Sequence, residues 1–567
     1  MKLATPKKIA EYRKAGWWGD DTFYDVFLRV VASRGDAVAA IDPPDREALT
    51  GRAPRRLSWS ELADETERTA AALAAQGLTK GDRVVMQMPN VVDTLSIYLA
   101  CAKLGVILSP VPVQYSGHEL RHALESVRPR AFLASARFKD RELAKACKAV
   151  AGDRAIVLSM DGGGEGLVDF SEAIANVKLK KGPLGLGGSA TKRVGGADDC
   201  FTICWTSGTT GVPKGVPRSH NHWIAIGPAT FHGMALKKHE VLLNPFPMTN
   251  MAAIGGMFAS WLTCEGTLVL HHPFELPVFL QQLVSEKVTA TIAPPAVLTI
   301  LLKQEGLLDQ FDLSALRVIG SGSAPLSEFM VSGWKARGVE IVNLFGSNEG
   351  ISLCSGPEDV PDTALRATAF PRFGHEKANF ANPMHARMKT KLVSIETGKE
   401  VTGPGEDGEL LVKGPSVFEG YWGSSAEELT EVFDADGYFR TGDLFQISPD
   451  DENFLLFRGR AKDIIIRGGV NISAAELDTL MEGHPKLKEA AVFGMPDEVM
   501  GERIWVAAVP ADGETITLED IVDFLKSKEI ANFKLPEKMI QVDALPRNPL
   551  NKVLRWRLVE MAKEQAG

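Results

Sequence analysis

Helical and strand-forming segments alternate through the first 345 residues, and this alternation limits the fold more than any other feature of the sequence. Apolar side chains recur at the 3.6-residue spacing of helices over residues 59–76, 92–104 and 118–127. Short runs rich in β-forming residues separate them, at 83–88, 131–133 and 155–158. Such alternation predicts an α/β sheet with parallel strands. After a glycine-rich segment at 162–199 it resumes from 201 to 345, which predicts a second α/β unit.

The remainder of the chain follows a different pattern. Between about 388 and 457 the strand-like runs are short and separated by Gly, Pro and Asp, which is typical of a compact β-rich region with hairpin turns. The residues after 460 mix helix and strand and are numerous enough to fold alone. We therefore predict a large N-terminal domain of two α/β sheet subdomains plus a β-rich, barrel-like subdomain, followed by a small, mobile α+β C-terminal domain.

Composition excludes several classes of protein. The chain has 567 residues and a net charge of −9, so it lacks the basic character of a dedicated nucleic-acid binder. Six cysteines without a C-x-x-C pair predict neither a disulfide framework nor a zinc site and favour a reducing compartment. The start has no apolar signal region, and the most apolar stretch, Val91 to Val113, is interrupted by charges and prolines. We expect a cytoplasmic protein without an integral membrane span.

The run Thr206-Ser-Gly-Thr-Thr-Gly-Val-Pro-Lys-Gly215 follows an apolar strand, Phe201 to Trp205. Its glycines let backbone N–H groups approach an anion, its hydroxyls donate hydrogen bonds and its lysine neutralises charge. It is not a Walker A loop, because G-x4-G-K-[ST] would need Gly at position 213 and Ser or Thr at position 215. We interpret the run as a polyphosphate-binding loop, with a flexible Ser/Thr/Gly linker as the alternative.

A second glycine-containing turn, Gly320-Ser-Gly-Ser-Ala-Pro325, follows the predicted strand at 316–319. Pro325 stands where a dinucleotide fingerprint needs Gly or Ala, and no acidic residue ends the next strand, so NAD binding is disfavoured. Proline suits the first turn of a helix. On this motif alone, a plain strand-to-helix turn is an equal alternative.

The order of these motifs resembles that of a known family. The later ones are Phe345-Gly-Ser-Asn-Glu349, Gly408-Glu-Leu, Tyr438-Phe-Arg-Thr-Gly-Asp443, Gly459-Arg-Ala-Lys-Asp463 and Leu545-Pro…Lys552. From about Tyr12 to Arg555 the chain resembles the adenylate-forming superfamily of acyl-CoA synthetases, adenylation domains and luciferases. Its opening, Tyr12-Arg-Lys-Ala-Gly-Trp-Trp18, looks more like members that activate aryl or alicyclic acids.

The resemblance implies an AMP-forming acid–thiol ligase, that is, an acyl-CoA synthetase. A carboxylate attacks the α-phosphate of ATP to give an acyl-adenylate and pyrophosphate, and the thiol of CoA then displaces AMP. Because the first step joins two anions, it needs cations at the phosphate. The resemblance makes Lys552 the catalytic lysine and Glu349 a catalytic residue that binds Mg²⁺ through hard oxygen ligands.

The resemblance also implies how the nucleotide is bound. The phosphate loop would hold the phosphates, Asp443 and Arg460 the ribose hydroxyls, and the ring of Phe345 would stack on adenine. The implied ATP-binding residues are Thr206, Ser207, Gly208, Thr209, Thr210, Lys214, Ser323, Ala324, Pro325, Asn343, Phe345, Gly346, Asn348, Asp443 and Arg460.

The resemblance also implies how the chain divides into domains. Residues 1–459 would form the domain that binds ATP and the acid, 460–463 the hinge with Lys462, and 464–567 the mobile domain. Gly468 and Gly469 would line the CoA channel, where the lack of a Cβ leaves room for a thiol, and they are equally compatible with a plain hairpin turn.

The acyl pocket would contain Asn250, Met251, Ile351 and Cys354, with Gly346 as a further residue that faces it. These side chains are small or medium and mixed in polarity, so we expect a cyclic, aromatic or medium-sized acid. The alternatives are an aryl- or acyl-AMP ligase that loads a separate carrier protein, a medium- or long-chain fatty acid–CoA ligase, and a non-catalytic nucleotide-binding regulator. The expected partners are the acid, ATP and CoA and no nucleic acid, with a homodimer left open.

The sequence departs from the family at several of these positions. Asn348 stands where most members have Thr, Phe345 where many have Tyr, Asn551 where most have Gly and Asn250 where many have His or an aromatic residue. An amide N–H of Asn348 still suits a phosphate. Four histidines without carboxylates at ligand spacing are interpreted as structural or loop residues: His220, His222, His271 and His272.

Overall fold

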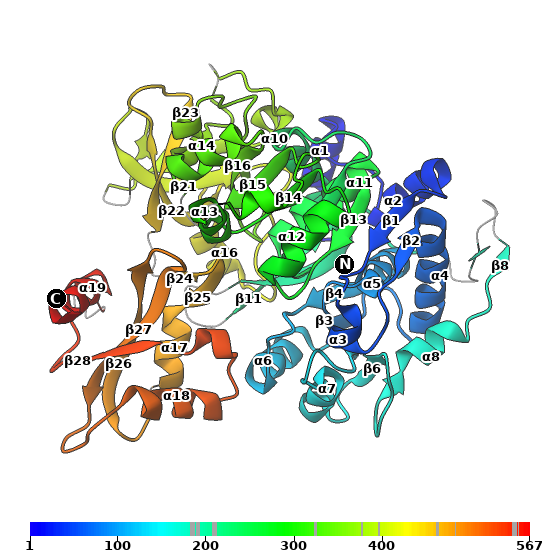
Figure 1. Ribbon diagram of the computed structural model, residues 1–567, viewed down its shortest axis with the longest axis horizontal. Coiled ribbons are helices and arrows are strands. Elements are labelled where there is room, and N and C mark those ends of the chain that lie inside the picture. Colours follow the sequence, from blue (N-terminus) through cyan, green and yellow to red (C-terminus); the bar gives the residue numbers. More distant parts are fainter. Residues whose placement is uncertain are drawn as a thin grey trace.

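The computed structural model of the chain describes residues 1–181, 187–188, 193–206, 213–304, 306–322, 326–375, 378–394, 397–460, 464–481, 484–546, 553 and 555–566. Two α/β layers, a β-rich part and a small separate domain follow one another in Figure 1, the last in orange and red. This is the predicted architecture.

The first sheet has the strand order β11-β10-β4-β3-β5-β6-β7. Its strands are β3 (Arg83–Gln87), β4 (Ile107–Pro110), β5 (Ala131–Ser135), β6 (Ile156–Met160), β7 (Val168–Asp169), β10 (Cys200–Thr206) and β11 (Lys214–Ser219). All neighbours are parallel except the β10–β11 hairpin. Its helices are α3 (Arg46–Thr50), α4 (Trp59–Ala75), α5 (Val92–Leu104), α6 (Gly117–Val127), α7 (Leu143–Ala151) and α8 (Phe170–Ala175).

The second sheet has the order β17-β16-β15-β14-β12-β13-β1-β2. Its strands are β1 (Val38–Ile41), β2 (Arg56–Ser58), β12 (Val241–Asn244), β13 (Thr267–Leu270), β14 (Ala290–Ile292), β15 (Val318–Gly322), β16 (Glu340–Gly346) and β17 (Ser352–Ser355). Its helices are α9 (His220–Ile224), α10 (Gly227–Gly233), the π-helix η1 (Ala252–Phe258), α11 (Ala259–Cys264), α12 (Leu276–Ser285), α13 (Pro295–Lys303), the 3₁₀ turn η2 (Leu308–Gln310) and α14 (Glu328–Ala336).

The two sheets exchange strands, which corrects the expectation of two consecutive α/β units. β1 and β2 come from the first unit but extend the second sheet, where Ala40 pairs with Leu268. β10 and β11 come from the second unit but form the edge of the first sheet. The exchange places the end of β10, and therefore the start of the phosphate loop, between the two layers.

The main core fills the space between these sheets. It is built from α4, α5, α11 and the N-terminal helix α2 (Phe23–Arg34). α5 is buried along its whole length, as its uninterrupted apolar sequence predicts. Trp59 and Trp261 stack at 4.6 Å between centroids and join the two halves. The first helix, α1 (Pro6–Lys14), packs outside through Ile9 and Tyr12.

The β-rich part is an antiparallel sheet with the order β18-β23-β22-β21-β19-β20. Its strands are β18 (Ala369–Pro371), β19 (Lys389–Val393), β20 (Glu400–Val401), β21 (Asp407–Lys413), β22 (Phe439–Ile447) and β23 (Phe454–Arg460). The helices α15 (Thr363–Thr368), η3 (Pro383–Ala386) and α16 (Ala426–Val432) flank it. Aromatic side chains dominate its core, which also receives Val216 of β11 and Ile351.

The C-terminal domain has its own core and its own sheet, in the order β25-β24-β27-β26 with β28 beside β27. Its elements are β24 (Ile464–Arg467), β25 (Val470–Ser473), α17 (Ala474–Met481), β26 (Leu487–Asp497), β27 (Gly501–Pro510), α18 (Leu518–Ser527), η4 (Asn532–Lys534), β28 (Lys538–Gln541) and α19 (Arg555–Ala566). Among the described residues, no helix is long and apolar enough to cross a bilayer.

The C-terminal domain contacts the large domain at the start of α6 (Figure 1). The carboxylate of Glu119 accepts a hydrogen bond from the Ala531 N–H at 3.1 Å and lies 3.6 Å from Nζ of Lys534. Lys534, which is 5% exposed, is also bonded to Glu476 of its own domain at 2.8 Å. Arg121 and Ser116 bond Glu529 nearby. A buried ion pair and several polar contacts therefore define this domain arrangement.

All four singled-out histidines are buried, and three of them have strongly lowered pKa values. Burial lowers the pKa of His220 and of His272 to about 3 and that of His222 to about 4. His272 stacks on Phe138 at 5.4 Å, and neither of its ring nitrogens has a hydrogen-bond partner among the described residues. These side chains must stay neutral in the folded state.

The free energy of unfolding should therefore fall as the pH drops below about 6.5. The unfolded chain binds a proton at each such histidine near that pH, whereas the folded chain resists protonation down to about pH 3 or 4, so the unfolded state gains protons first. His272→Phe should remove the contribution of one histidine to this pH dependence, which is about 2 kcal/mol of the free energy of unfolding between pH 7 and pH 5. Urea unfolding at both pH values measures it. His239→Phe at an exposed position is the control, and an equal pH dependence of both variants would contradict this account.

Candidate active site

The predicted phosphate loop connects the two strands of the β10–β11 hairpin. Thr206 pairs with Lys214 across this hairpin, and Trp205 pairs with Gly215. The backbone ladder therefore brings the first predicted residue of the loop and its lysine side by side. The loop residues between them, Ser207, Gly208, Thr209 and Thr210, lie outside the described residues.

Lys214 and Glu349 meet at Tyr421, a residue that the sequence motifs do not include. The Tyr421 hydroxyl donates a 3.0 Å hydrogen bond to Oε1 of Glu349. Nζ of Lys214 lies 4.9 Å from the centre of the Tyr421 ring. Burial and the neighbouring Glu349 carboxylate raise the pKa of Tyr421, so the hydroxyl remains a donor. The predicted phosphate-binding cation and the predicted metal ligand are thus held around one phenol ring.

A buried arginine holds the segment that carries Glu349. Arg218, in β11, is 0% exposed and donates to the backbone carbonyls of Asn348 at 2.8 Å, His222 at 3.0 Å and Ser416 at 2.8 Å. Its guanidinium lies 4.3 Å over the ring of Trp223. Complete burial lowers the pKa of Arg218 to about 9, while the Cys204 and Glu349 side chains act in the opposite direction. These bonds hold the segment that carries Glu349 against β11.

Gly350 allows the chain to pass close to this arginine. Its φ is +110°, a backbone conformation that side chains with a Cβ rarely adopt. A Cβ there would overlap the Ser416 carbonyl and approach Nη1 of Arg218 to 2.8 Å. Only glycine therefore fits directly after the predicted metal ligand.

The predicted nucleotide residues converge from two strands. On β16, Asn343 donates its amide to the carbonyls of Arg366 and Ala367 at 3.1 and 3.0 Å, and Phe345 contacts the ring of Phe445 edge-on at 5.1 Å. Phe445 lies on β22, two residues after Asp443.

Asp443 is buried and lies directly opposite Arg460 in the β22–β23 ladder. The two residues predicted to bind the ribose are thus neighbours. Ser323, Ala324 and Pro325 lie outside the described residues.

Asn348 and the predicted acyl residues form the next part of the site. Oδ1 of Asn348 accepts the Met251 N–H at 2.8 Å, and its Nδ2 donates to the Trp205 carbonyl at 2.9 Å. Asn250 uses its own Oδ1 to accept the Ala253 N–H at 3.2 Å, where η1 begins. Both asparagines therefore bond backbone groups, and the predicted contact of Asn348 with phosphate stays a prediction.

The other predicted acyl residues lie in two different environments: some are exposed at the site, and others are buried in the protein core. Gly346 is exposed, and a Cβ there would lie 2.9 Å from the Ile351 carbonyl and 3.8 Å from Cγ of Met251. Ile351 is buried in the aromatic core of the β-rich part. Cys354 packs against Gly233 of α10, and burial raises the pKa of its thiol to about 12. Met251 and Gly346 are the acyl residues that the structure brings together.

Only some of the predicted site residues of the C-terminal domain are among the described residues. Gly468 and Gly469 form the two-residue turn between β24 and β25, with φ of +56° and +80°. Positive φ at both central residues is the geometry of a tight hairpin turn. Lys462 and Lys552 lie outside the described residues.

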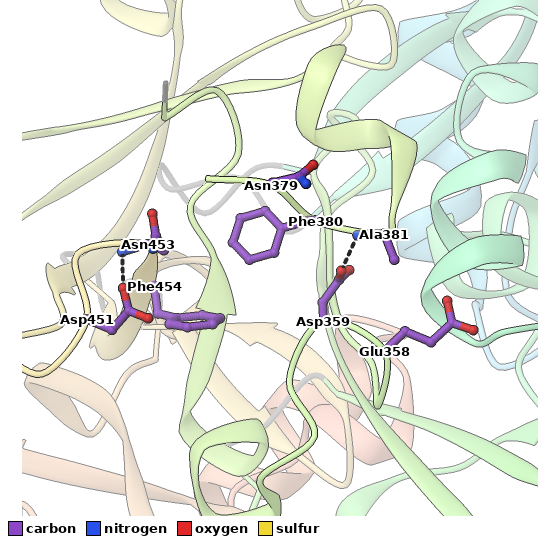
Figure 2. Close-up of a pocket in the computed structure, with 8 residues that line it drawn as sticks. All are labelled: Glu358, Asp359, Asn379, Phe380, Ala381, Asp451, Asn453 and Phe454. Carbon is purple, nitrogen blue, oxygen red and sulfur yellow. Dashed lines mark hydrogen bonds between the residues drawn. The ribbon is translucent and has the colours of Figure 1, made fainter. Parts of the chain in front are cut away.

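A cavity of about 540 Å³ lies elsewhere, on the β-rich part (Figure 2). Its lining is Glu358, Asp359, Asn379, Phe380, Ala381, Asp451, Asn453 and Phe454. Burial raises the pKa of Asp359, although the N–H groups of Ala381 and Asn382 bond it. Three carboxylates would repel a polyphosphate. The lining of the cavity contains none of the predicted site residues.

Comparison with known proteins decides the family. Residues 36–422 match the sequence model of the AMP-binding enzymes, and residues 476–552 match the model of the AMP-binding enzyme C-terminal domain. The chain belongs to the AMP-binding enzyme family. The predictions of the adenylate-forming superfamily, of the α/β fold and of an AMP-forming acid–thiol ligase are confirmed.

Individual relatives cover nearly the whole chain. It is 31% identical to an indoleacetate–CoA ligase of Aromatoleum aromaticum, over 90% of this chain and 94% of that protein. It is 30% identical to the mouse mitochondrial medium-chain acyl-CoA ligase ACSF2, over 92% and 86% of the respective chains. The amide bond synthetase McbA from Marinactinospora thermotolerans has the same fold, with a TM-score of 0.77, 23% identity and coverage of 94% and 99%.

Replacing Gly350 by Ala should disrupt this site. We expect the free energy of unfolding to fall by more than about 4 kcal/mol, and AMP binding to be lost, because the new methyl group overlaps the Ser416 carbonyl. Gly405→Ala is the matched control, since Gly405 also has a positive φ, +83°, but has open space around it. That variant should lose only about 1 kcal/mol. Thermal unfolding and AMP titration measure both, and equal effects would contradict the steric account.

Proposed function

We propose that this enzyme is an ATP-dependent carboxylate–CoA ligase whose acid is cyclic, aromatic or medium-sized. The observation that carries the proposal is the meeting of Lys214, at the end of the phosphate loop, and Glu349 around Tyr421. Met251 is joined to this region through its bond to Asn348, the neighbour of Glu349. A polyphosphate and a carboxylate bound there would lie next to one another. Both substrates are anions, so the site must supply positive charge.

In the proposed first step a carboxylate oxygen bonds to the α-phosphorus of ATP and pyrophosphate leaves. Lys214 and the hydroxyls of residues 206–210 would hold the phosphates. Asp443 would accept hydrogen bonds from the ribose hydroxyls, and Arg460 would donate hydrogen bonds to them. Lys552 would stabilise the negative charge that develops at phosphorus, an effect that typically supplies about 10²- to 10³-fold in rate. The chain's main contribution is to hold two repelling anions in contact.

Glu349 suits a Mg²⁺ ion that enters with the nucleotide. Mg²⁺ is usually held by one or two carboxylates together with substrate phosphates, and not by a cage of protein ligands. When bound, the ion would neutralise phosphate charge. Tyr421 would keep the Glu349 carboxylate oriented toward it.

In the proposed second step the CoA sulfur bonds to the acyl carbon and AMP leaves. We propose that residues 460–463, with Lys462, form the hinge between a domain at 1–459 and a mobile domain at 464–567. The Gly468–Gly469 turn would then approach the adenylate, and its lack of side chains would admit the thiol.

Indoleacetate is aromatic, and the names of other relatives specify medium-chain or long-chain fatty acids. These names include the proposed acid class and keep a medium- or long-chain fatty acid as the second candidate. The half-buried Met251 beside Gly346 favours a compact acid. A cytoplasmic location and a homodimer remain predictions.

A screen of carboxylic acids tests the proposed function. With ATP, Mg²⁺ and CoA, we expect release of AMP and pyrophosphate with arylacetic, benzoic or medium-chain acids, and little with palmitate. Liquid chromatography of the nucleotides separates AMP from ADP. Formation of ADP would contradict the mechanism, and a preference for palmitate would contradict the acid class. Requirement for a carrier protein in place of CoA would favour the alternative acceptor.

The two half-reactions should respond to different residues of the C-terminal domain. Lys552→Ala should slow adenylate formation about 10²- to 10³-fold and leave thioester formation from a supplied acyl-adenylate nearly intact. Gly469→Trp should do the opposite, because a large ring would obstruct the thiol path. Single-turnover assays of pyrophosphate release and of thioester formation measure both steps. Lys563→Ala, an exposed lysine of the same domain, is the control. Parallel losses in both assays for both variants would argue against domain alternation.

A further inference from the structure

The Asn348 side chain joins two parts of the site that the reaction must bring together. Its Nδ2 donates to the carbonyl of Trp205, the residue before the phosphate loop, at 2.9 Å. Its Oδ1 accepts the N–H of Met251, the residue that precedes η1 on the predicted acyl side, at 2.8 Å. One planar amide thus spans from the start of the phosphate loop to the start of η1.

The position of this amide is fixed by its surroundings. Nη1 of the buried Arg218 donates to the Asn348 carbonyl at 2.8 Å. On the C-terminal side, the Phe418 N–H donates to the Glu349 carbonyl at 2.8 Å, and Gly350 leaves no room for a Cβ. The backbone on which the amide is mounted therefore cannot shift without breaking bonds to β11 and to the β-rich part.

The two partners of the amide are also anchored. The Trp205 indole N–H donates to Oγ of Ser109 at 2.9 Å, which ties β10 to β4. Met251 packs its thioether over Gly255, where a Cβ would come within 2.7 Å of the sulfur. Movement at Met251 would therefore carry Asn250 and the start of η1 with it. The amide connects two well-packed elements at the ends nearest the site.

We propose that Asn348 is a positioning residue that sets the distance between the phosphate loop and the acyl pocket. The inference rests on the proposed function, since it concerns the approach of a carboxylate to the α-phosphate. Reacting atoms must be held about 3–3.5 Å apart, and a displacement of about 1 Å can cost about 10²-fold in rate. Asparagine suits the task because its amide donates at one end and accepts at the other.

This role differs from a direct contact of Asn348 with phosphate, which the sequence predicts. A phosphate contact would contribute to the binding of ATP by itself. A spacing role would contribute little to the binding of ATP alone or of the acid alone. It would contribute much to the binding of a molecule that occupies both subsites at once. The two roles therefore predict different losses for the same substitution.

Asn348→Asp tests the proposal with almost no change in shape. The carboxylate still accepts the Met251 N–H, but its second oxygen faces the Trp205 carbonyl and repels it. Asn382→Asp is the matched control. Asn382 is 2% exposed and likewise bridges a backbone carbonyl, that of Ala229 at 3.1 Å, and a backbone N–H, that of Met384 at 3.1 Å.

The probes are ATP, the free acid, and acyl-sulfamoyl adenosines that carry benzoyl, phenylacetyl or octanoyl groups, each titrated by calorimetry. For Asn348→Asp we expect the affinity for the best acyl-sulfamoyl adenosine to fall at least tenfold more than for Asn382→Asp. Because a carboxylate near the phosphates repels ATP by itself, the affinities for ATP and for the acid alone are compared in the neutral variant Asn348→Ala, where they should change less than about threefold. In pyrophosphate release by Asn348→Ala, kcat should fall at least tenfold while the KM for ATP is retained.

The outcomes separate this proposal from the function on which it rests. Equal losses in the Asn348 and Asn382 variants, or a loss confined to ATP, would overturn the spacing role while the wild type still binds the joined analogue. Failure of the wild type to bind any of the three analogues would overturn the proposed function and the spacing role with it. If Asn348→Asp does not fold, Asn348→Ala decides, because removal of both side-chain bonds should give the same selective loss.

Discussion

The guanidinium of Arg218 is the interaction on which the arrangement of the site depends. A fully buried cation is costly unless its donors are paired, and among the described residues the two Nη atoms of Arg218 donate to three backbone carbonyls while Nε has no partner. Those carbonyls belong to Asn348, His222 and Ser416, which lie on three separate segments. The strand that leaves the phosphate loop, the segment with Glu349 and the β-rich part are therefore fixed relative to one another by a single side chain.

Around this anchor, the exchange of strands between the sheets creates the site. The phosphate loop connects β10 and β11 at the edge of the first sheet, whereas Glu349, Asn348 and Phe345 follow or lie on β16 in the second. Neither sheet alone contains both halves of the chemistry. Ligand sites in α/β proteins commonly form at the carboxyl ends of strands, and here two such edges face each other.

α6 places the C-terminal domain beside this same region. Glu119 near its start binds Ala531 and Lys534, while His122 one turn later lies 2.8 Å from the Pro213 carbonyl at the end of the phosphate loop. Trp422, next to Tyr421, donates its indole N–H to the Ser126 carbonyl on α6. The domain contact and the exit of the phosphate loop thus share one short, amphipathic helix.

The sequence by itself determined the α/β class, most element positions, the β-rich part and the family, because helix and strand periodicity and motif order are local properties. α5 and the strand before the phosphate loop are examples. Only the tertiary structure decided that β1 and β10 exchange sheets, that Tyr421 bonds a carboxylate 72 positions away, and that the Asn348 amide bonds Trp205 and Met251. No local signal marks those partners. Such contacts depend on which distant surfaces pack together, and a residue's immediate neighbours in the sequence do not determine that packing.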